Sequence, residues 1–455
     1  MGGVTDDRGG VGLEPADERD FVLRTVQERE IGFVRLWFAD VLGFLKSFAI
    51  PAEELDQALE EGVGFDGSAV AGFARVQESD MVARPDPTTF QILPWRPSSP
   101  AVARMYCDVY RPDGEPFEGD PRGVLRRVMR HAADLGFSCY AGPELEFFLF
   151  ADKTAPTPLD DGGYFDLTPL DVGSDFRRRA ITYLEQMGIP VKDSHHEVAA
   201  SQHEVDLRHT DAFTMADSIM TFRLIVKEVA QQLGIYATFM PKPIQGAWGS
   251  GMHTHLSLFE GERNAFFDAT DPYGMSKVAR SFAAGMLRHA PGITAITNQW
   301  VNSYKRLVPG FEAPVHVSWG VQNRSALVRV PRTKPGKEAA GRIEYRAPDP
   351  ACNPYLALAV MIAAGLDGVE REEELGPEAA DDIHTLSDAE RRRAGIASLP
   401  ESLPEALTAM EQSELVQRVL GDHLMGWFLA NKRAEWDEYR SYVTGLELER
   451  NLPRL

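Results

Sequence analysis

The spacing of apolar residues in the first hundred positions predicts a helix followed by strands. Between residues 19 and 30, Val22 and Val26 recur at the interval of a helical face. Residues 32–50 alternate apolar and polar side chains in the manner of a strand, and residues 90–93 form a second strand pattern within a proline-rich stretch. The pattern therefore predicts a small mixed domain in this region.

A run of turn-forming residues at 110–120 separates this region from the rest of the chain. A helix is predicted directly after it, at residues 121–135, and further helices then mix with short strands that have one polar face. A charged loop is predicted at 370–402, and helical periodicity at 403–442 favours a role in packing or assembly. The chain is therefore predicted to be α+β, with a small N-terminal and a large C-terminal domain.

One predicted strand carries two carboxylates on the same face. In PELEFFLF, the two-residue period of a strand puts Glu144 beside Glu146, with apolar side chains on the opposite face. Two carboxylates among aromatic residues repel each other and lose hydration, unless cations or hydrogen-bond donors compensate. Alone, this pair would favour an exposed sheet face.

Three further segments supply polar side chains in the same way. GSGMHTHLSL and GRIEYRAPD are predicted strands with a polar face, and HHEVAASQHEVDLR is predicted as a strand, a loop and a second strand. The polar residues of these segments are Glu197, Glu204, His253, His255, Arg342, Glu344 and Arg346. Five carboxylates and a histidine in such settings match a site for Mg²⁺ or Mn²⁺ better than one for zinc, because cysteine ligands are absent from these segments.

Arginines are frequent in the C-terminal part of the same region, at positions 306, 324, 329, 342 and 346. Hard cations beside arginines favour phosphoryl transfer, because both neutralise charge on the transferred phosphoryl oxygens. A single one of these arginines would more often form a surface salt bridge.

Composition narrows the class of protein. The 455-residue chain has a formal net charge of −21, which argues against nucleic acid or an anionic membrane as a partner. Cys107, Cys139 and Cys352 are too few and too widely spaced for a disulfide framework or a zinc motif. The first 20 residues lack the apolar core of a signal peptide, and the apolar helix candidate at 356–364 is shorter than the ~20 residues of a membrane span. A cytoplasmic protein is predicted.

From about Glu18 to the C-terminus, the chain resembles the glutamine synthetase family of bacterial type. The segments that carry this resemblance, in the family's order, are GFDGSAV, PELEFF, SHHEV with QHEVD, FMPKP with GSGMHTHLSLF, NQWVNSYKRLVPGFEAP, NRSALVRVP, RIEYRAPDP and NPYLALAVMIAAGLDG. The resemblance implies a flexible tail at 1–18, a β-grasp domain at 19–112, and a catalytic domain at 113–455 with a curved antiparallel sheet flanked by helices.

The same resemblance implies an ATP-dependent ligase with two or three Mg²⁺ or Mn²⁺ ions per site. Such an enzyme forms a γ-glutamyl amide from glutamate and an amine through a γ-glutamyl phosphate. By the resemblance, one ion is held by Glu146, Glu197 and Glu204, and another by Glu144, His253 and Glu344.

Substrate contacts also follow from the resemblance. Residues matching Gly249, Arg306 and Arg346 bind the glutamate, and those matching Arg324, Arg329 and Lys337 face the nucleotide phosphates. Asp66 matches the base that deprotonates ammonium, and Tyr164, Glu197 and Glu312 match the rest of that cation pocket. Glu312 also matches the catalytic residue of a flap, here at 309–314, that excludes water from the intermediate.

The family's usual assembly is a dodecamer of two stacked hexameric rings. In that assembly each site is completed by the N-terminal domain of a neighbouring subunit, which would place Asp66 across a subunit interface.

The chain departs from the family pattern at four positions. Trp248 replaces an asparagine, Ala69 replaces a serine near the ammonium pocket, and Ser201 replaces a glycine between the metal glutamates. The tyrosine that is adenylylated in some bacterial members is matched by His384.

The first three departures leave the acceptor open. They favour a primary amine or polyamine, as in actinobacterial γ-glutamylpolyamine synthetases, because an anionic pocket serves an alkylammonium as well as ammonium. If they are neutral changes, the chain is a glutamine synthetase that uses ammonia. A third alternative is an inactive member with a binding or structural role, against which the six matched metal ligands count.

Overall fold

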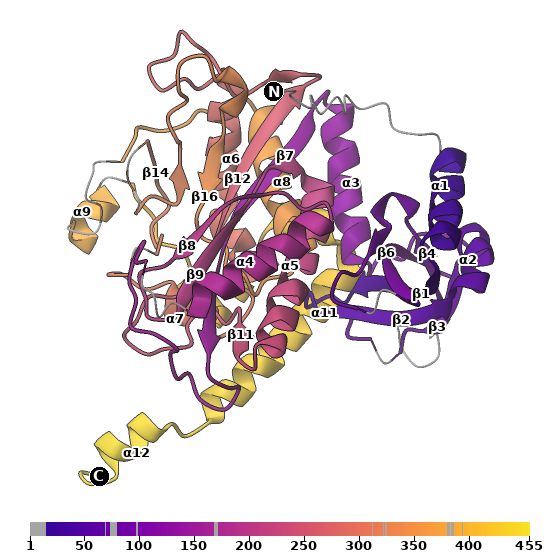
Figure 1. The fold of residues 1–455 in the computed structure, drawn as a ribbon. Coiled ribbons are helices and arrows are strands. Elements are labelled where there is room, and N and C mark those ends of the chain that lie inside the picture. The colour runs from indigo at the N-terminus through magenta and orange to yellow at the C-terminus, as the bar shows by residue number, and fades with distance from the viewer. Residues whose placement is uncertain are drawn as a thin grey trace. The chain divides into compact units, whose positions relative to one another are not determined.

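The computed structural model describes residues 15–68, 70–72, 80–96, 99–167, 172–311, 313–321, 323, 325–379, 383, 386–393 and 395–455. The chain divides into two compact units (Figure 1). The first unit comprises Met1–Phe38, Leu45–Ala69 and Ala74–Phe117, and the second comprises Ala39–Phe44, Val70–Phe73 and Glu118–Leu455. Of the sequence-predicted positions, Ala69, Glu312, Arg324 and His384 lie outside the described residues.

The first unit is built on a sheet with the strand order β2-β1-β6-β4-β3, in which β5 also pairs with β6. Its core lies between this sheet and α1, where alternate residues such as Val34, Leu36 and Met105 are buried. The elements are α1 (Pro15–Glu28), β1 (Ile31–Ala39), β2 (Leu45–Pro51), α2 (Leu55–Glu61), β3 (Val63–Asp66), β4 (Asp80–Pro85), β5 (Gln91–Ile92) and β6 (Ala101–Tyr110).

The single strand predicted at residues 32–50 is wrong, because the chain turns between β1 and β2. The carboxylate of Asp40 accepts a hydrogen bond of 2.9 Å from the Phe44 backbone N–H, and Gly43 between them has a φ of 79°. Glycine adopts this left-handed conformation without a steric penalty. Asp40 and Gly43 are turn-forming residues, so the sequence contained a signal for this turn that periodicity alone did not reveal.

The second unit holds a larger sheet with the strand order β14-β15-β16-β12-β7-β9-β8. Strands β10 and β11 also pair with β7, and β13 pairs with β12. The strands are β7 (Ser138–Phe150), β8 (Val191–His196), β9 (Gln202–Leu207), β10 (Thr210–Asp211), β11 (Tyr236–Thr238), β12 (Met252–Glu260), β13 (Arg263–Asn264), β14 (Trp319–Gly320), β15 (Val328–Arg329) and β16 (Ile343–Tyr345). The long strand β7 lies between β9 and β12 in this sheet, and both of these strands run antiparallel to it.

Most helices of the second unit lie beside this sheet, whereas α12 projects away from it at the C-terminal end (Figure 1). The helices of this unit are α3 (Pro121–Asp134), α4 (Val172–Gln186), α5 (Ala212–Gln232), α6 (Lys277–Thr297), α7 (Ser303–Arg306), α8 (Pro354–Glu370), α9 (Asp388–Arg393), α10 (Leu403–Glu411), α11 (Glu414–Ser441) and α12 (Gly445–Asn451). The helix predicted at 121–135 is α3, and the charged stretch predicted as a loop contains the short helix α9.

Helix α8 is apolar on all sides and is buried almost along its whole length. It packs on α6 so closely that a Cβ atom at Gly285 would lie 2.3 Å from the carbonyl oxygen of Ala364. Glycine is therefore required at this crossing. Within the described residues, no helix combines the length and the hydrophobicity that crossing a membrane would take.

Candidate metal and phosphoryl-transfer site

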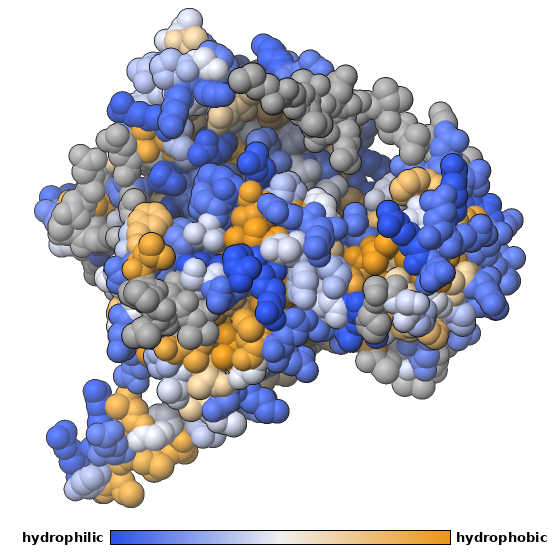
Figure 2. All heavy atoms as spheres, viewed as in Figure 1, coloured by the Kyte–Doolittle hydropathy of each residue, from blue (hydrophilic) through white to orange (hydrophobic). Residues whose placement is uncertain are grey.

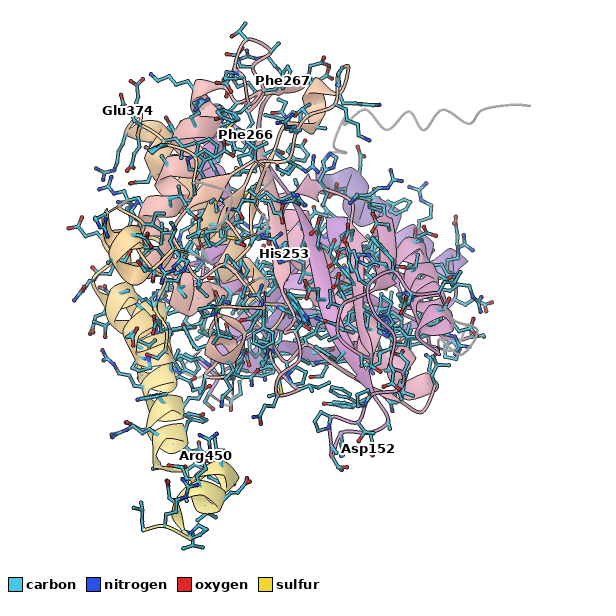
Figure 3. The ribbon with its side chains drawn as sticks, turned by 90° about the vertical axis from the view of Figure 1, so that its left-hand side faces the viewer. Asp152, His253, Phe266, Phe267, Glu374 and Arg450 are labelled. Carbon is cyan, nitrogen blue, oxygen red and sulfur yellow. The ribbon has the colours of Figure 1, made fainter. Side chains whose placement is uncertain are left out.

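Strand register brings the predicted carboxylates together on one face of the large sheet. On β7, Glu144 lies opposite His253 of β12, and Glu146 lies opposite Glu204 of β9. The two-residue period then puts Glu144 and Glu146 on the same face. On the other side of β12, Glu344 of β16 lies opposite His255. Figure 3 labels His253 among these strands.

The first group of ligands, called here the Glu344 group, consists of Glu144, His253 and Glu344. One ligand atom from each lies within 4.8 Å of the others. The His253 Nδ1 atom is 3.4 Å from Glu144 Oε2 and 4.0 Å from Glu344 Oε1. This grouping agrees with the second ligand set that the sequence predicts.

Positive groups of the protein compensate the Glu344 group. Arg346 donates a hydrogen bond of 2.7 Å to Glu344 Oε1, and Arg329 donates to Glu344 Oε2. Burial alone would raise the pKa of Glu344, but Arg346, with smaller contributions from His255 and His253, outweighs burial and lowers the pKa.

The other carboxylate of the group is compensated by histidines. Burial would raise the pKa of Glu144, but hydrogen bonds from His253 and His255 lower it. Arg342 donates to His255 Nδ1 at 3.3 Å, so the proton that His255 donates to Glu144 sits on Nε2. Burial, followed by Arg346, lowers the pKa of His253, which favours the neutral imidazole that a metal requires.

The second group, called here the Glu146 group, consists of Glu146, Glu197 and Glu204. Glu197 directly follows β8, and the other two lie opposite each other on β7 and β9. Glu146 Oε2 accepts hydrogen bonds of 3.0 Å from the Gly251 backbone and from Gln202. These two donors fix the position of the carboxylate.

The Glu146 group carries an excess of buried negative charge. Burial, followed by repulsion from Glu197, raises the pKa of Glu146 to about 8. Burial, followed by repulsion from Glu146, raises the pKa of Glu204 well above its ordinary value. A hard divalent cation would remove this repulsion, and the donors are the oxygens that Mg²⁺ or Mn²⁺ prefers. The residues present therefore fit the ion.

The structure adds His195, which the sequence analysis did not assign. Its Nε2 atom lies 3.0 Å from Glu197 Oε1 and 3.8 Å from Glu204 Oε1, and these three side chains form a possible ligand set of their own. His195 lies two residues before Glu197 in SHHEV, so the strand period of two was the signal that could have revealed it.

Arg306 and Gly249 border the same sheet face. The Arg306 side chain is buried and donates to the Ala347 and Arg346 carbonyl oxygens at 2.6 and 3.2 Å. A Cβ atom at Gly249 would lie 2.5 Å from the Pro241 carbonyl oxygen, so glycine is required there. Gln202 donates to the Gly249 carbonyl at 3.1 Å, which links this glycine to the Glu146 group.

The remaining predicted residues lie as follows. Trp248 is partly buried against Phe148 and Phe150, with its ring edge-on to Phe311. Tyr164 is 44% exposed, and its ring lies edge-on to that of His195. Lys337 is exposed at the start of a short 3-10 helix.

Asp66 belongs to the first unit, at the exposed end of β3. Its carboxylate accepts a hydrogen bond of 2.8 Å from the Ser68 backbone N–H.

The site joins a buried carboxylate cluster to an arginine-flanked carboxylate and histidine group, which is the arrangement of a metal-dependent phosphoryl-transfer enzyme. Two family models match almost the whole chain. "Glutamine synthetase, beta-Grasp domain" matches residues 30–112, and "Glutamine synthetase, catalytic domain" matches residues 118–451.

Relatives along the full length agree with these matches. "Glutamine synthetase" of Mycolicibacterium smegmatis is 58% identical over 96% of this chain and 99% of its own, and that of Methanosarcina mazei is 50% identical over 98% and 100%. The solved structure "GmaS/ADP complex-Conformation 1" has a TM-score of 0.86 at 33% identity, covering 95% of this chain and 99% of its own. "CryoEM Plasmodium falciparum glutamine synthetase" has a TM-score of 0.86 at 25% identity, covering 97% and 99%.

The chain therefore belongs to the glutamine synthetase family. The predicted fold class is confirmed: α+β, with a small N-terminal β-grasp domain and a large catalytic domain built on a sheet flanked by helices. The predicted enzyme class, an ATP-dependent ligase that forms a carbon–nitrogen bond, is also confirmed, and the family uses ATP and divalent metals.

Proposed function

We propose that the chain joins an amine to the side-chain carboxylate of glutamate, after ATP has converted that carboxylate to γ-glutamyl phosphate. The observation that supports this reaction is the pairing of the two groups on one sheet face. The Glu344 group with Arg329 and Arg346 suits phosphate oxygens, and the Glu146 group suits a cation beside the amino-acid substrate.

Each predicted residue takes a role in this proposal. The Glu146 and Glu344 groups would each hold a Mg²⁺ or Mn²⁺ ion, with two or three ions per site, and bound ions would neutralise the charge on the transferred phosphoryl group. Gly249 would bind the backbone of glutamate, and Arg306 and Arg346 would hold the glutamate or its phosphorylated carboxylate. Arg324, Arg329 and Lys337 would hold the ATP phosphates. Because Arg306 is buried and anchored to two carbonyl oxygens, it presents its charge in a fixed direction.

The amine must lose a proton before it can attack the acyl phosphate. We assign this step to Asp66 of a neighbouring subunit, with Tyr164, Glu197 and Glu312 completing the cation pocket. The flap at 309–314, which contains Glu312, would exclude water that would otherwise hydrolyse the intermediate.

For the acceptor, we favour a primary amine or polyamine over ammonia. Tyr164 and Phe165 are 44% and 64% exposed, and both rings lie against His195, which contacts Glu197. An alkylammonium could place its charge at the carboxylate and its methylene groups on these rings. Ammonia is the alternative, because the relatives at 58% identity are named glutamine synthetase.

Phosphate release from ATP tests this proposal directly. The assay contains glutamate and Mg²⁺ with ammonia, ethanolamine, putrescine or spermine as the acceptor, and mass spectrometry identifies the amide. Release with the organic amines, at a higher kcat/KM than with ammonia, is expected. A preference for ammonia makes the chain a glutamine synthetase, and no release with any acceptor indicates the inactive alternative.

Asp66→Ala tests the proposed base. Amide formation should fall by roughly 10²-fold or more, while ATP binding changes little, because the side chain is assigned to proton transfer alone. Nucleotide binding is measured by calorimetry, and Asp80→Ala on the neighbouring strand is the control. Equal loss of nucleotide binding and amide formation would instead indicate a structural role.

We also propose that the chain forms a homo-oligomer, a dodecamer of two hexameric rings. The C-terminal segment that contains α12 exposes large hydrophobic side chains, and Figure 2 shows orange, hydrophobic residues on this segment at the lower left. They are Tyr442, Val443, Leu446, Leu448, Leu452 and Leu455. Such a surface is typical of a subunit contact, and mass photometry would measure the assembly.

A cytoplasmic location remains part of the proposal. Cys139 and Cys352 are free and buried, which suits a reducing compartment.

A further inference from the structure

The turn at residues 197–202, between β8 and β9, contains a serine in a strained conformation. Ser201 is fully buried and has a φ of 57°, in the left-handed region that L residues other than glycine rarely adopt. Glycine would occupy this conformation without strain. The serine side chain must therefore make contacts that offset the cost.

Those contacts join the turn to a loop about 40 residues earlier in the chain. Ser201 Oγ accepts hydrogen bonds from the Leu159 and Asp160 backbone N–H groups, the second at 3.1 Å. The Ser201 backbone N–H donates to Asp160 Oδ1 at 2.9 Å, and the Gly162 N–H donates to the same oxygen at 3.1 Å. One serine thus closes three hydrogen bonds across the two segments.

Asp160 continues the connection to the Glu146 group. Its Oδ1 atom lies 2.9 Å from His196 Nε2, and His196 Nδ1 donates to the Glu197 carbonyl oxygen at 2.7 Å. His203 packs edge-on to His196 and accepts from Arg177 at 2.7 Å. Asp160, His196 and His203 lie close enough to resemble a metal site. Asp160 Oδ1, both ring nitrogens of His196 and Nδ1 of His203 are engaged by these partners, and these contacts connect the turn to the loop.

The loop that Ser201 holds carries the exposed aromatic pair. The Phe165 backbone N–H donates to the His196 carbonyl oxygen at 3.1 Å, so the loop is attached to the same region at both ends. Phe165 itself has a φ of 61°, a rare conformation for a bulky residue, and such strain is often found at functional sites. Its ring centroid lies 4.6 Å from that of His195 and 4.1 Å from that of Tyr164.

We propose that Ser201 is a positioning residue for the acceptor amine. Through its hydroxyl and its backbone N–H, it fixes the loop at 159–165, so that the Tyr164 and Phe165 rings stay over His195 beside Glu197. The role of this aromatic pair rests on the proposed function, whereas the attachment of the loop does not depend on it.

Ser201→Ala and Ser201→Gly test the proposal with two measurements. Hydrogen–deuterium exchange of the Leu159 and Asp160 amides should accelerate by about tenfold or more in both variants, because both amides lose their acceptor. The KM for the acceptor amine should rise several-fold, while the KM for ATP stays within about twofold. Ser201→Gly should melt at a higher temperature than Ser201→Ala, because glycine relieves the strain that alanine keeps.

Ser281→Ala is the matched control. Ser281 is also buried in the second unit, and its hydroxyl donates to the Glu373 carbonyl at 3.0 Å. This variant should lower the melting temperature without changing the exchange at Leu159 and Asp160 or the KM of the acceptor.

The outcomes separate the inference from the proposed function. Unchanged exchange in the Ser201 variants overturns the attachment of the loop. Faster exchange with a wild-type KM for the acceptor overturns the positioning role, although the enzyme is active. If none of the acceptors causes the wild-type protein to release phosphate, the proposed function fails. The role of Ser201 in acceptor binding then fails too, even when the exchange result confirms the attachment of the loop.

Discussion

The Glu146 group and the Glu344 group lie side by side on one sheet, yet their surroundings shift the pKa values of their carboxylates in opposite directions. In the Glu344 group, Arg346 and the histidines lower the pKa of Glu344, so the buried carboxylate is ionised without a metal. In the Glu146 group, burial and mutual repulsion raise the pKa of Glu146 and Glu204. Arg306 and Arg346 lower the pKa of Glu146 too little to reverse this.

This difference indicates that the two groups have different roles within one site. The Glu344 group is electrostatically complete in the protein alone, so its arginines are already in place for a phosphate. The Glu146 group is incomplete without a cation, so metal binding and local stability are coupled there.

The largest effect is expected from Glu146→Ala. Turnover should fall by roughly 10³-fold or more and metal affinity should weaken, because a ligand on the central strand is lost. Phosphate release and Mn²⁺ calorimetry measure the two effects. Glu262→Ala removes an exposed carboxylate from the same unit and should behave as the wild type. Near-normal turnover in Glu146→Ala would contradict the ligand assignment.

Glu344→Gln should destabilise the protein even without metal, by about 3 kcal/mol, because it leaves the buried Arg346 without its carboxylate. Urea denaturation in EDTA measures the free energy of unfolding. Glu411→Gln is the control, since it removes one partner of the exposed Arg433 pair and should cost below about 1 kcal/mol. If Glu344→Gln lowered the free energy of unfolding by a similarly small amount, the ion pair between Arg346 and Glu344 would not be stabilising the protein.

The pH dependence of protein stability should distinguish the Glu146 group from the Glu344 group less strongly than these substitutions do. The pKa of Glu146 is raised from 4.5 to about 8, so the folded protein keeps a proton that the unfolded chain loses between these values. The stabilising effect of this proton is complete below pH 4.5, shrinks as the pH rises, and is lost above about pH 8.

Bound metal displaces that proton, so Mg²⁺ affinity should rise with pH, by up to about tenfold per unit below pH 8. Calorimetry in two buffers of different ionisation enthalpy measures the proton release. Glu146→Gln should show a weaker pH dependence. An affinity that is independent of pH between 6 and 8 would contradict the raised pKa.

The smallest expected effect has the opposite sign from that of Glu344→Gln. Glu204→Gln should stabilise the metal-free protein at neutral pH by about 1 kcal/mol, because the wild type must either protonate this buried carboxyl group or bear its repulsion from Glu146. In saturating Mg²⁺ the same variant should be less stable than the wild type. Denaturation with and without metal measures both, and a destabilised metal-free variant would remove the contrast between the groups.

The sequence predicts well which side chains share one face of a strand. It predicts poorly which strands pair with each other. The two-residue period correctly put Glu144 with Glu146, and His253 with His255, as the alternating burial of β12 shows. Strand order and register depend on contacts between distant segments, so the pairing of Glu146 with Glu204 could not be derived from either strand alone.

Two other features were missed for physical reasons. His195 was not assigned because the two-residue strand period was not extended back from Glu197, which lies just beyond the end of β8. That period selects His195, and the structure turns the adjacent His196 toward Asp160. The turn between β1 and β2 was missed because apolar residues continue on both sides of it, although Asp40 and Gly43 are turn-forming residues.

The imidazole of His253 links the two halves of the site through opposite edges of one ring. Its Nδ1 atom faces Glu144 at 3.4 Å, and its Nε2 atom faces Glu146 at 4.0 Å. Since the two nitrogens share one π system, a ligand at either edge withdraws electron density from the other. The halves are therefore electronically connected, and filling one is expected to change how tightly the other is filled.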